Sequence, residues 1–116
     1  MKRIQFYTCP TCGNILTATA NAEVTCCGRK LLPLAAQPAD EAHHLDVELI
    51  EDDFYITFSH EMCKSHFLNF VALVGYDRLI LVRLYPEQGW EVRLPKARRG
   101  QLYFGCSQHG LFVTSI

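Results

Sequence analysis

The sequence has no long apolar run, no strong charge of one sign and hardly any helical periodicity. No apolar run approaches the roughly 18 residues that span a bilayer, so we expect no membrane contact. The formal net charge of −1 gives no bulk attraction to nucleic acid or to an anionic membrane surface. The first residues show no apolar stretch with a cleavage site, which predicts a cytoplasmic protein without a signal peptide.

The composition is that of a folded domain with an excess of cysteine. The chain has 116 residues, of which 49% are apolar and 20% charged, so it can bury a core. Six cysteines in a chain expected to be cytoplasmic indicate metal binding before disulfides, because that compartment keeps thiols reduced. A disulfide-rich secreted domain is therefore set aside.

Four cysteines in residues 1–35 form two pairs with the spacing of a metal site. Cys9 and Cys12 make a Cys-x-x-Cys followed by glycine, and Cys26 and Cys27 are adjacent. Neighbouring side chains on a strand point to opposite faces, so the backbone must bend sharply for both to reach one ion. Four thiolates suit zinc or a single iron, and no βαβ pattern supports a thioredoxin-like dithiol instead. We expect the metal to hold this small module together.

The remainder of the chain shows the pattern of an antiparallel β-sandwich. After a small, polar, proline-bearing joint at 35–40, short apolar and alternating runs are separated by turn residues at regular spacing. The segment 41–44 is too short to distinguish a helical turn from a loop. The expected strands are 47–50, 54–58, 67–74, 79–85, 90–94, 101–104 and 111–116.

The histidines and one further cysteine fall at the expected strand ends and loops of this module. Histidine is the commonest neutral metal ligand, and a Cys-x-x-His flanked by glycines can bend until both side chains meet one ion. A loop between two of the histidines must fold back for them to share that ion. The candidates are His43, His44, His60, His66, Cys106 and His109.

These motifs together resemble desulfoferrodoxin, the two-iron superoxide reductase, over nearly the whole chain and in preserved order. The resemblance implies a desulforedoxin-like four-cysteine domain at 1–35 and an immunoglobulin-like β-sandwich at 36–116. In the family the sandwich carries a ferrous centre with four equatorial histidines and one axial cysteine. By resemblance, one iron (or zinc in its place) takes Cys9, Cys12, Cys26 and Cys27, and the Fe(II)/Fe(III) centre takes His60, His66, Cys106 and His109.

The fourth equatorial histidine depends on how one motif is matched. The family's Glu-Lys-His-Val-Pro reads Glu41-Ala42-His43-His44-Leu45 here. Matching from the glutamate makes His43 the ligand and keeps Glu41 as the carboxylate that can cap ferric iron. Matching on His44 would place Ala42 at that glutamate. We prefer His43, because it also keeps the following strand in an ungapped register.

The resemblance also implies a function and partners. The family reduces superoxide to hydrogen peroxide by one electron, which an external donor such as rubredoxin returns, and a homodimer is expected. A competing interpretation is a non-catalytic iron or zinc protein, either an electron carrier or a metal sensor, on the same scaffold. The departures keep it open: the motif lysine is Ala42, and Leu45 and Glu61 replace prolines.

One cysteine and one cation are left to explain. Cys63 has no counterpart in the motif; it is either a structural thiol or an oxidation-sensitive one beside the iron. We hypothesise that His44 or Lys64 replaces the missing lysine as the cation that attracts the anion.

Overall fold

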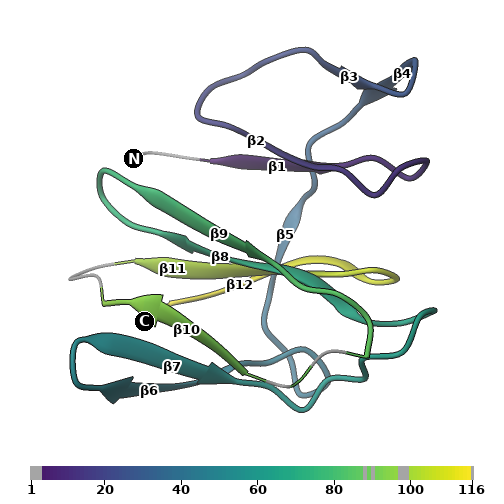
Figure 1. Ribbon diagram of the computed structural model, residues 1–116. Coiled ribbons are helices and arrows are strands. Elements are labelled where there is room, and N and C mark those ends of the chain that lie inside the picture. Colours follow the sequence, from purple (N-terminus) through teal and green to yellow (C-terminus); the bar gives the residue numbers. More distant parts are fainter. Residues whose placement is uncertain (1–3, 88, 90, 97–99, 116) are drawn as a thin grey trace. The chain divides into compact units, whose positions relative to one another are not determined.

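The computed structural model describes residues 4–87, 89, 91–96 and 100–115. The described residues form strands, turns and loops without any helix, so the predicted all-β class is confirmed (Figure 1). The chain divides into two compact units, Met1–Ala35 and Ala36–Ile116. Within the described ranges we find no helix long and apolar enough to cross a membrane.

The first unit consists of two small antiparallel hairpins. Strand β1 (Gln5–Thr8) pairs with β2 (Ile15–Ala18), and β3 (Val24–Cys26) pairs with β4 (Arg29–Leu31). One buried cluster in this unit contains Tyr7, Cys9 and Leu31, with partly buried apolar side chains around them, and Ile4 and Phe6 are buried as well. So few buried side chains among the described residues are consistent with a unit that relies on a bound metal for part of its stability.

The adjacent cysteines are accommodated by the tight turn between β3 and β4. Cys26 pairs with Arg29 across the hairpin, which leaves Cys27 and Gly28 as a two-residue loop. Both have positive φ, 55° and 71°, as a type I′ turn requires. The sharp bend expected from two neighbouring cysteines is this turn.

The second unit is a sandwich of two sheets. One sheet has the order β10 (Glu91–Pro95), β7 (Asp53–Thr57), β6 (Asp46–Ile50). The other has the order β5 (Ala36–Pro38), β12 (Gly110–Ser115), β11 (Gln101–Cys106), β8 (Leu68–Val74), β9 (Leu79–Arg83). A continuous apolar core draws on both sheets, including Ile56, Val92, Leu102 and Phe104. The predicted β-sandwich is confirmed.

The strands predicted in this unit all occur, and their ends in the described residues shift by at most two positions. Trp90 and Ile116, where two predicted strands began or ended, lie outside the described residues. The joint expected at 35–40 differs from the structure. Residues 36–38 form β5, which pairs with β12, and this pairing is parallel whereas the others are antiparallel.

A bulge shapes the end of β11 that leads into the loop between Cys106 and Gly110. Gly105 lies opposite Phe70 of β8 but Cys106 lies opposite Leu68, so Asn69 is skipped in the register. A Cβ on Gly105 would lie 2.4 Å from Asn69 Oδ1 and 2.5 Å from Phe70 Cε1. Glycine is therefore required here by close approach of the neighbouring strand, and it seats Cys106 directly after the bulge.

Candidate metal centres

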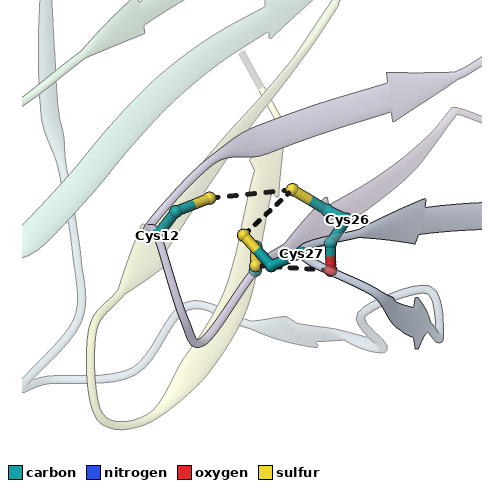
Figure 2. A group of neighbouring side chains, drawn as sticks. Cys12, Cys26 and Cys27 are labelled. Carbon is teal, nitrogen blue, oxygen red and sulfur yellow. Dashed lines mark hydrogen bonds between the residues drawn. The ribbon is translucent and has the colours of Figure 1, made fainter.

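The four cysteines of the first unit meet at one point. Figure 2 labels three of them, Cys12, Cys26 and Cys27. Their sulfur atoms all lie within 4.8 Å of one another. Cys12 Sγ is 3.6 Å from Cys26 Sγ, which is 4.0 Å from Cys27 Sγ. Two sulfurs that are each about 2.3 Å from a tetrahedral ion lie about 3.8 Å apart, so the spacing fits four thiolates on one zinc or iron. It is far too long for disulfides, and all six cysteines are free.

Each pair is held by local backbone structure. The knuckle at Cys9 is closed by hydrogen bonds from its N–H to the Asn14 carbonyl, at 2.9 Å, and from the Gly13 N–H to its carbonyl, at 2.8 Å. Gly13 has a φ of 75°, which favours glycine. Asn14 Nδ2 lies 3.8 Å from Cys26 Sγ and can donate to that sulfur.

The acid–base properties of these thiols also indicate a cation. Backbone hydrogen bonding from Cys12 lowers the pKa of Cys9 to about 6. Hydrogen bonding to Cys12, then to the other two thiols, raises the pKa of Cys27 to about 12. The four thiols therefore lose one proton readily but resist losing all four. A bound metal ion is what would make all four ionised at neutral pH.

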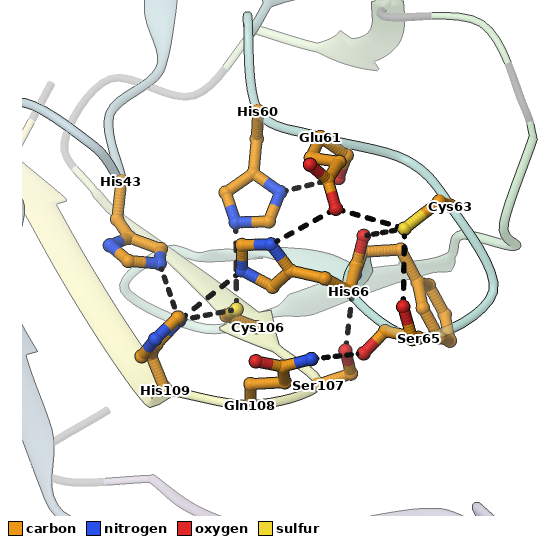
Figure 3. Close-up of polar contacts among 11 residues, drawn as sticks. His43, His60, Glu61, Cys63, Ser65, His66, Cys106, Ser107, Gln108 and His109 are labelled. Atoms are coloured by element: carbon orange, nitrogen blue, oxygen red, sulfur yellow. Dashed lines mark hydrogen bonds and ion pairs between the residues drawn. The ribbon is translucent and has the colours of Figure 1, made fainter.

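The second cluster lies at one end of the sandwich, in the second unit (Figure 3). Three segments far apart in the sequence contribute to it. His43 comes from the loop before β6, His60 and His66 from the loop between β7 and β8, and Cys106 and His109 from the β11–β12 hairpin. Ligand atoms of His43, His60, His66 and Cys106 lie within 4.8 Å of one another.

His109 completes the cluster through its Nδ1 atom. This atom lies 3.2 Å from His43 Nε2, 3.3 Å from His66 Nε2 and 3.3 Å from Cys106 Sγ. Cys106 Sγ is also 3.5 Å from His60 Nε2. Four imidazole nitrogens and one sulfur therefore converge on a common space.

Hydrogen bonds outside the cluster fix which nitrogen each ring presents. His60 Nδ1 lies 2.6 Å from the Glu61 carbonyl oxygen, which only accepts, so Nδ1 carries the proton. His43 Nδ1 is 3.1 Å from the Asp40 carboxylate, which also accepts. In the neutral rings of His43 and His60, each Nε2 atom then carries a lone pair that points into the cluster. A metal ion between these lone pairs and the Cys106 sulfur could bind all of them, and this donor set suits iron or zinc.

The cluster has a buried side and an open side. Cys106, His43 and His60 are only 4%, 6% and 7% exposed, whereas His109 is exposed. Burial lowers the pKa of His60, and charge on the neighbouring histidines lowers it further. His60 is therefore neutral near pH 7 and available as a ligand. The cluster is open to solvent on the side of His109.

A set of hydrogen bonds joins the loops that carry the ligands. The Ser107 N–H donates to the Phe67 carbonyl at 2.9 Å, and the Phe67 N–H donates to Ser107 Oγ at 3.1 Å. Gln37 of β5 donates to the His109 carbonyl at 3.0 Å. Cys63 and His66 exchange backbone hydrogen bonds of 3.1 Å, so the loop folds back between His60 and His66. These hydrogen bonds link the loop of His60 and His66 to the β11–β12 hairpin, and that hairpin to β5.

Three other residues singled out in the sequence lie outside this cluster. The His44 side chain is 48% exposed, and its Nε2 lies 3.1 Å from Asp46 Oδ1. Glu41 is exposed and does not belong to the cluster of ligand atoms. Cys63 Sγ lies 2.9 Å from Glu61 Oε1, and that oxygen is 3.6 Å from His66 Nδ1.

The sequence analysis did not identify the residues that hold the ligands. Asp40, Phe112, Ser107 and Gln37 all contact a ligand residue or its loop. An aspartate three residues before a histidine was an available signal for Asp40, because aspartate side chains commonly accept from backbone N–H groups in turns. The other three contacts join distant parts of the chain and leave no local pattern.

Comparison with known proteins gives a consistent result. No protein family model matches the chain. The desulfoferrodoxin of Desulfarculus baarsii is 28% identical, with 94% of each chain covered. That of Syntrophotalea carbinolica is 26% identical over 96% of this chain and 95% of the relative, and that of Clostridium acetobutylicum 25% identical over 81% and 80%.

A solved structure shows the same fold. The crystal structure of the superoxide reductase from Treponema pallidum matches with a TM-score of 0.82 and 20% identity, covering 97% of both chains. At 20% identity, this match shows a shared fold and no more. In sequence motifs and in fold, this chain resembles the desulfoferrodoxins along nearly its whole length, as the sequence analysis predicted.

Proposed function

We propose that this protein is a superoxide reductase, with iron bound at the histidine–cysteine cluster. The observation that carries the proposal is the convergence of four imidazole nitrogens and one buried thiol on one space in the sandwich. The similarity to desulfoferrodoxins supports it, because the relative from Desulfarculus baarsii is 28% identical over 94% of both chains. His43 is proposed as the fourth histidine ligand, since its ring faces the cluster and that of His44 does not.

The chemistry follows from the donor set. Iron bound there would supply the single electron that, with two protons, converts superoxide to hydrogen peroxide. Neutral imidazoles favour the ferrous state, and the Cys106 thiolate donates electron density. The exposed side at His109 admits a small anion, while apolar packing around Cys106 excludes bulk water from the other side. Glu41, exposed two residues before His43, is proposed as the carboxylate that caps the ferric site.

The first unit is proposed as a separate four-cysteine domain, residues 1–35, that holds iron, or zinc in its place. Its sulfur spacing supports either metal. Residues 36–116 are proposed as the superoxide reductase domain. An external one-electron donor such as rubredoxin, a cytoplasmic location and a homodimer complete the proposal by analogy with the family.

One feature favours a second candidate function. The family lysine that attracts superoxide is Ala42, and the described residues bring no lysine or arginine into hydrogen bond or ion pair with the cluster. A non-catalytic electron carrier or metal sensor needs no such cation. Electrostatic steering mainly alters the rate of encounter, so its loss predicts slower capture rather than no reaction.

Two neighbouring histidines provide a matched test. Purified protein, loaded anaerobically with ferrous iron, is assayed for iron per chain, for its visible spectrum after oxidation and for its rate with superoxide. We expect two irons per chain, and a second visible band that belongs to the histidine–cysteine centre. His43→Ala should lose that band and the superoxide rate, while His44→Ala keeps the band.

The outcomes separate the candidate functions. A centre that binds iron but does not react with superoxide would favour the electron carrier or sensor. If the cluster does not bind iron under anaerobic loading, both the proposed enzyme activity and the proposed ligand set are refuted. If His44→Ala rather than His43→Ala removed the band, the ligand assignment would be wrong.

A further inference from the structure

Asp40 closes the turn that presents His43. Its backbone N–H donates to the His43 carbonyl at 3.0 Å, and the His43 N–H donates back to Asp40 Oδ1 at 2.6 Å. The same carboxylate oxygen lies 3.1 Å from Nδ1 of the His43 ring. One side chain therefore fixes both the backbone and the ring of this histidine.

The other side of the His43 ring is fixed by packing. The ring stacks on Phe112 of β12, with centroids 4.2 Å apart and an angle of 8° between the planes. Phe112 is 2% exposed and belongs to the apolar core. With one face against Phe112 and Nδ1 against Asp40, Nε2 is the atom left to face the cluster, 3.2 Å from His109 Nδ1.

We propose that Asp40 is a positioning residue of the histidine–cysteine centre: it holds the His43 ring in the Nδ1–H tautomer and directs Nε2 at the metal. This inference rests on the proposed function only in that the cluster must bind a metal. A carboxylate that accepts from the free nitrogen of a ligand histidine orients the ring and makes it a stronger donor. It also adds negative charge beside the centre, which favours ferric over ferrous iron.

The chain contains a matched control. Asp46 Oδ1 lies 3.1 Å from His44 Nε2, the same separation as in the Asp40–His43 pair, but His44 is exposed and lies outside the cluster. Variants at Asp46 remove an equivalent aspartate–histidine contact next to the site without touching a proposed ligand. A positioning role predicts different effects at the two aspartates, whereas general loss of surface charge predicts similar ones.

The test uses the full chain and three readouts. The histidine tautomers are determined by long-range ¹H–¹⁵N NMR on the metal-free and the zinc-loaded protein. The affinity of the histidine–cysteine site for Zn²⁺ is measured from the ring shifts of the ligand histidines, which report this site alone. The midpoint potential of the iron form is measured from its visible band.

Two substitutions at Asp40 distinguish the effect of its hydrogen bonds from the effect of its negative charge. Asp40→Ala removes both hydrogen bonds, so we expect a mixture of His43 tautomers and a loss in Zn²⁺ affinity of about 10- to 100-fold. Asp40→Asn keeps an accepting oxygen and loses the charge, so the tautomer should persist while the potential rises. A tenfold change in the ratio of ferric to ferrous affinity corresponds to about 59 mV for one electron.

Asp46→Ala and Asp46→Asn should change none of the three readouts. The proposal is overturned if His43 keeps the Nδ1–H tautomer in metal-free Asp40→Ala, or if the Asp40 and Asp46 variants bind Zn²⁺ alike. Should Asp40→Ala fail to fold, an unchanged potential in Asp40→Asn would count against it equally. Absence of superoxide activity in the unsubstituted protein would refute the proposed enzyme while leaving these three readouts to decide the role of Asp40.

Discussion

Replacing Gly105 by alanine should destabilise the second unit and weaken its metal site together. The added Cβ would lie 2.4 Å from Asn69 Oδ1 and 2.5 and 2.9 Å from two ring carbons of Phe70. Neither neighbour yields easily. Phe70 is fully buried and Asn69 Oδ1 is also buried, so surrounding atoms limit the movement of both. Overpacking of this kind costs about 1 to 3 kcal/mol.

In a unit of this size the Tm should fall by about 4 to 8 °C for each kcal/mol lost. Because Cys106 follows directly, the backbone shift that relieves the clash should also displace its sulfur and lower the affinity for metal. Urea unfolding of the metal-free protein gives the stability, and Zn²⁺ titration gives the affinity.

The control for this substitution is Gly89→Ala, where nothing lies within 4 Å of the added carbon. Combining Gly105→Ala with Phe70→Leu removes the clashing ring atoms, so the double variant should lose less stability than the sum of the two single losses. A Gly105→Ala protein within about 0.5 kcal/mol of the unsubstituted one would refute the argument, because surface-like substitutions cost no more than that.

Three further substitutions test the metal centres and their loops. Cys106→Ser should remove the visible band of the histidine–cysteine iron and leave the four-cysteine iron spectrum intact, as absorption spectroscopy would show. Cys12→Ser should do the reverse and lower the iron content by one per chain, measured by metal analysis. Ser107→Ala removes the hydrogen bond from the Phe67 N–H and should cost about 0.5 to 1.5 kcal/mol in urea unfolding.

The sequence was sufficient to predict the strands of the sandwich other than β5. The alternation of apolar and polar residues, together with the turn residues between the runs, located these strands. One face of each strand must pack against the core, so every second residue is apolar. Strand β8 was found for a different reason, as a continuous apolar run, since it lies between neighbours on both sides and is buried along most of its length. Composition alone sufficed there.

Strand β5 could not be predicted in this way. Its three residues, Ala36, Gln37 and Pro38, are all exposed and carry no apolar pattern. The strand exists because its backbone pairs with β12, more than 70 positions later in the chain. Backbone pairing between distant segments has no signature in the local sequence.

The sequence could predict that the candidate ligands cluster, but it could not predict the contacts that position them. Cysteine and histidine are few and chemically distinctive, so their spacing alone pointed to two metal clusters. Asp40, Phe112 and Gly105 act through contacts that depend on the final packing of the strands. The choice between His43 and His44 was made in the sequence from a motif register, and the structure adds the direction of each ring.

Strand β5 also has a consequence for association between molecules. Without it, β12 would be the outer strand of its sheet and would offer six residues of unpaired backbone beside the His109 loop. Such an edge is a template for pairing with another chain. The strand that covers it is only three residues long and ends in Pro38, which has no N–H to donate. The short strand thus keeps a neighbouring molecule from extending the sheet next to the open side of the metal site.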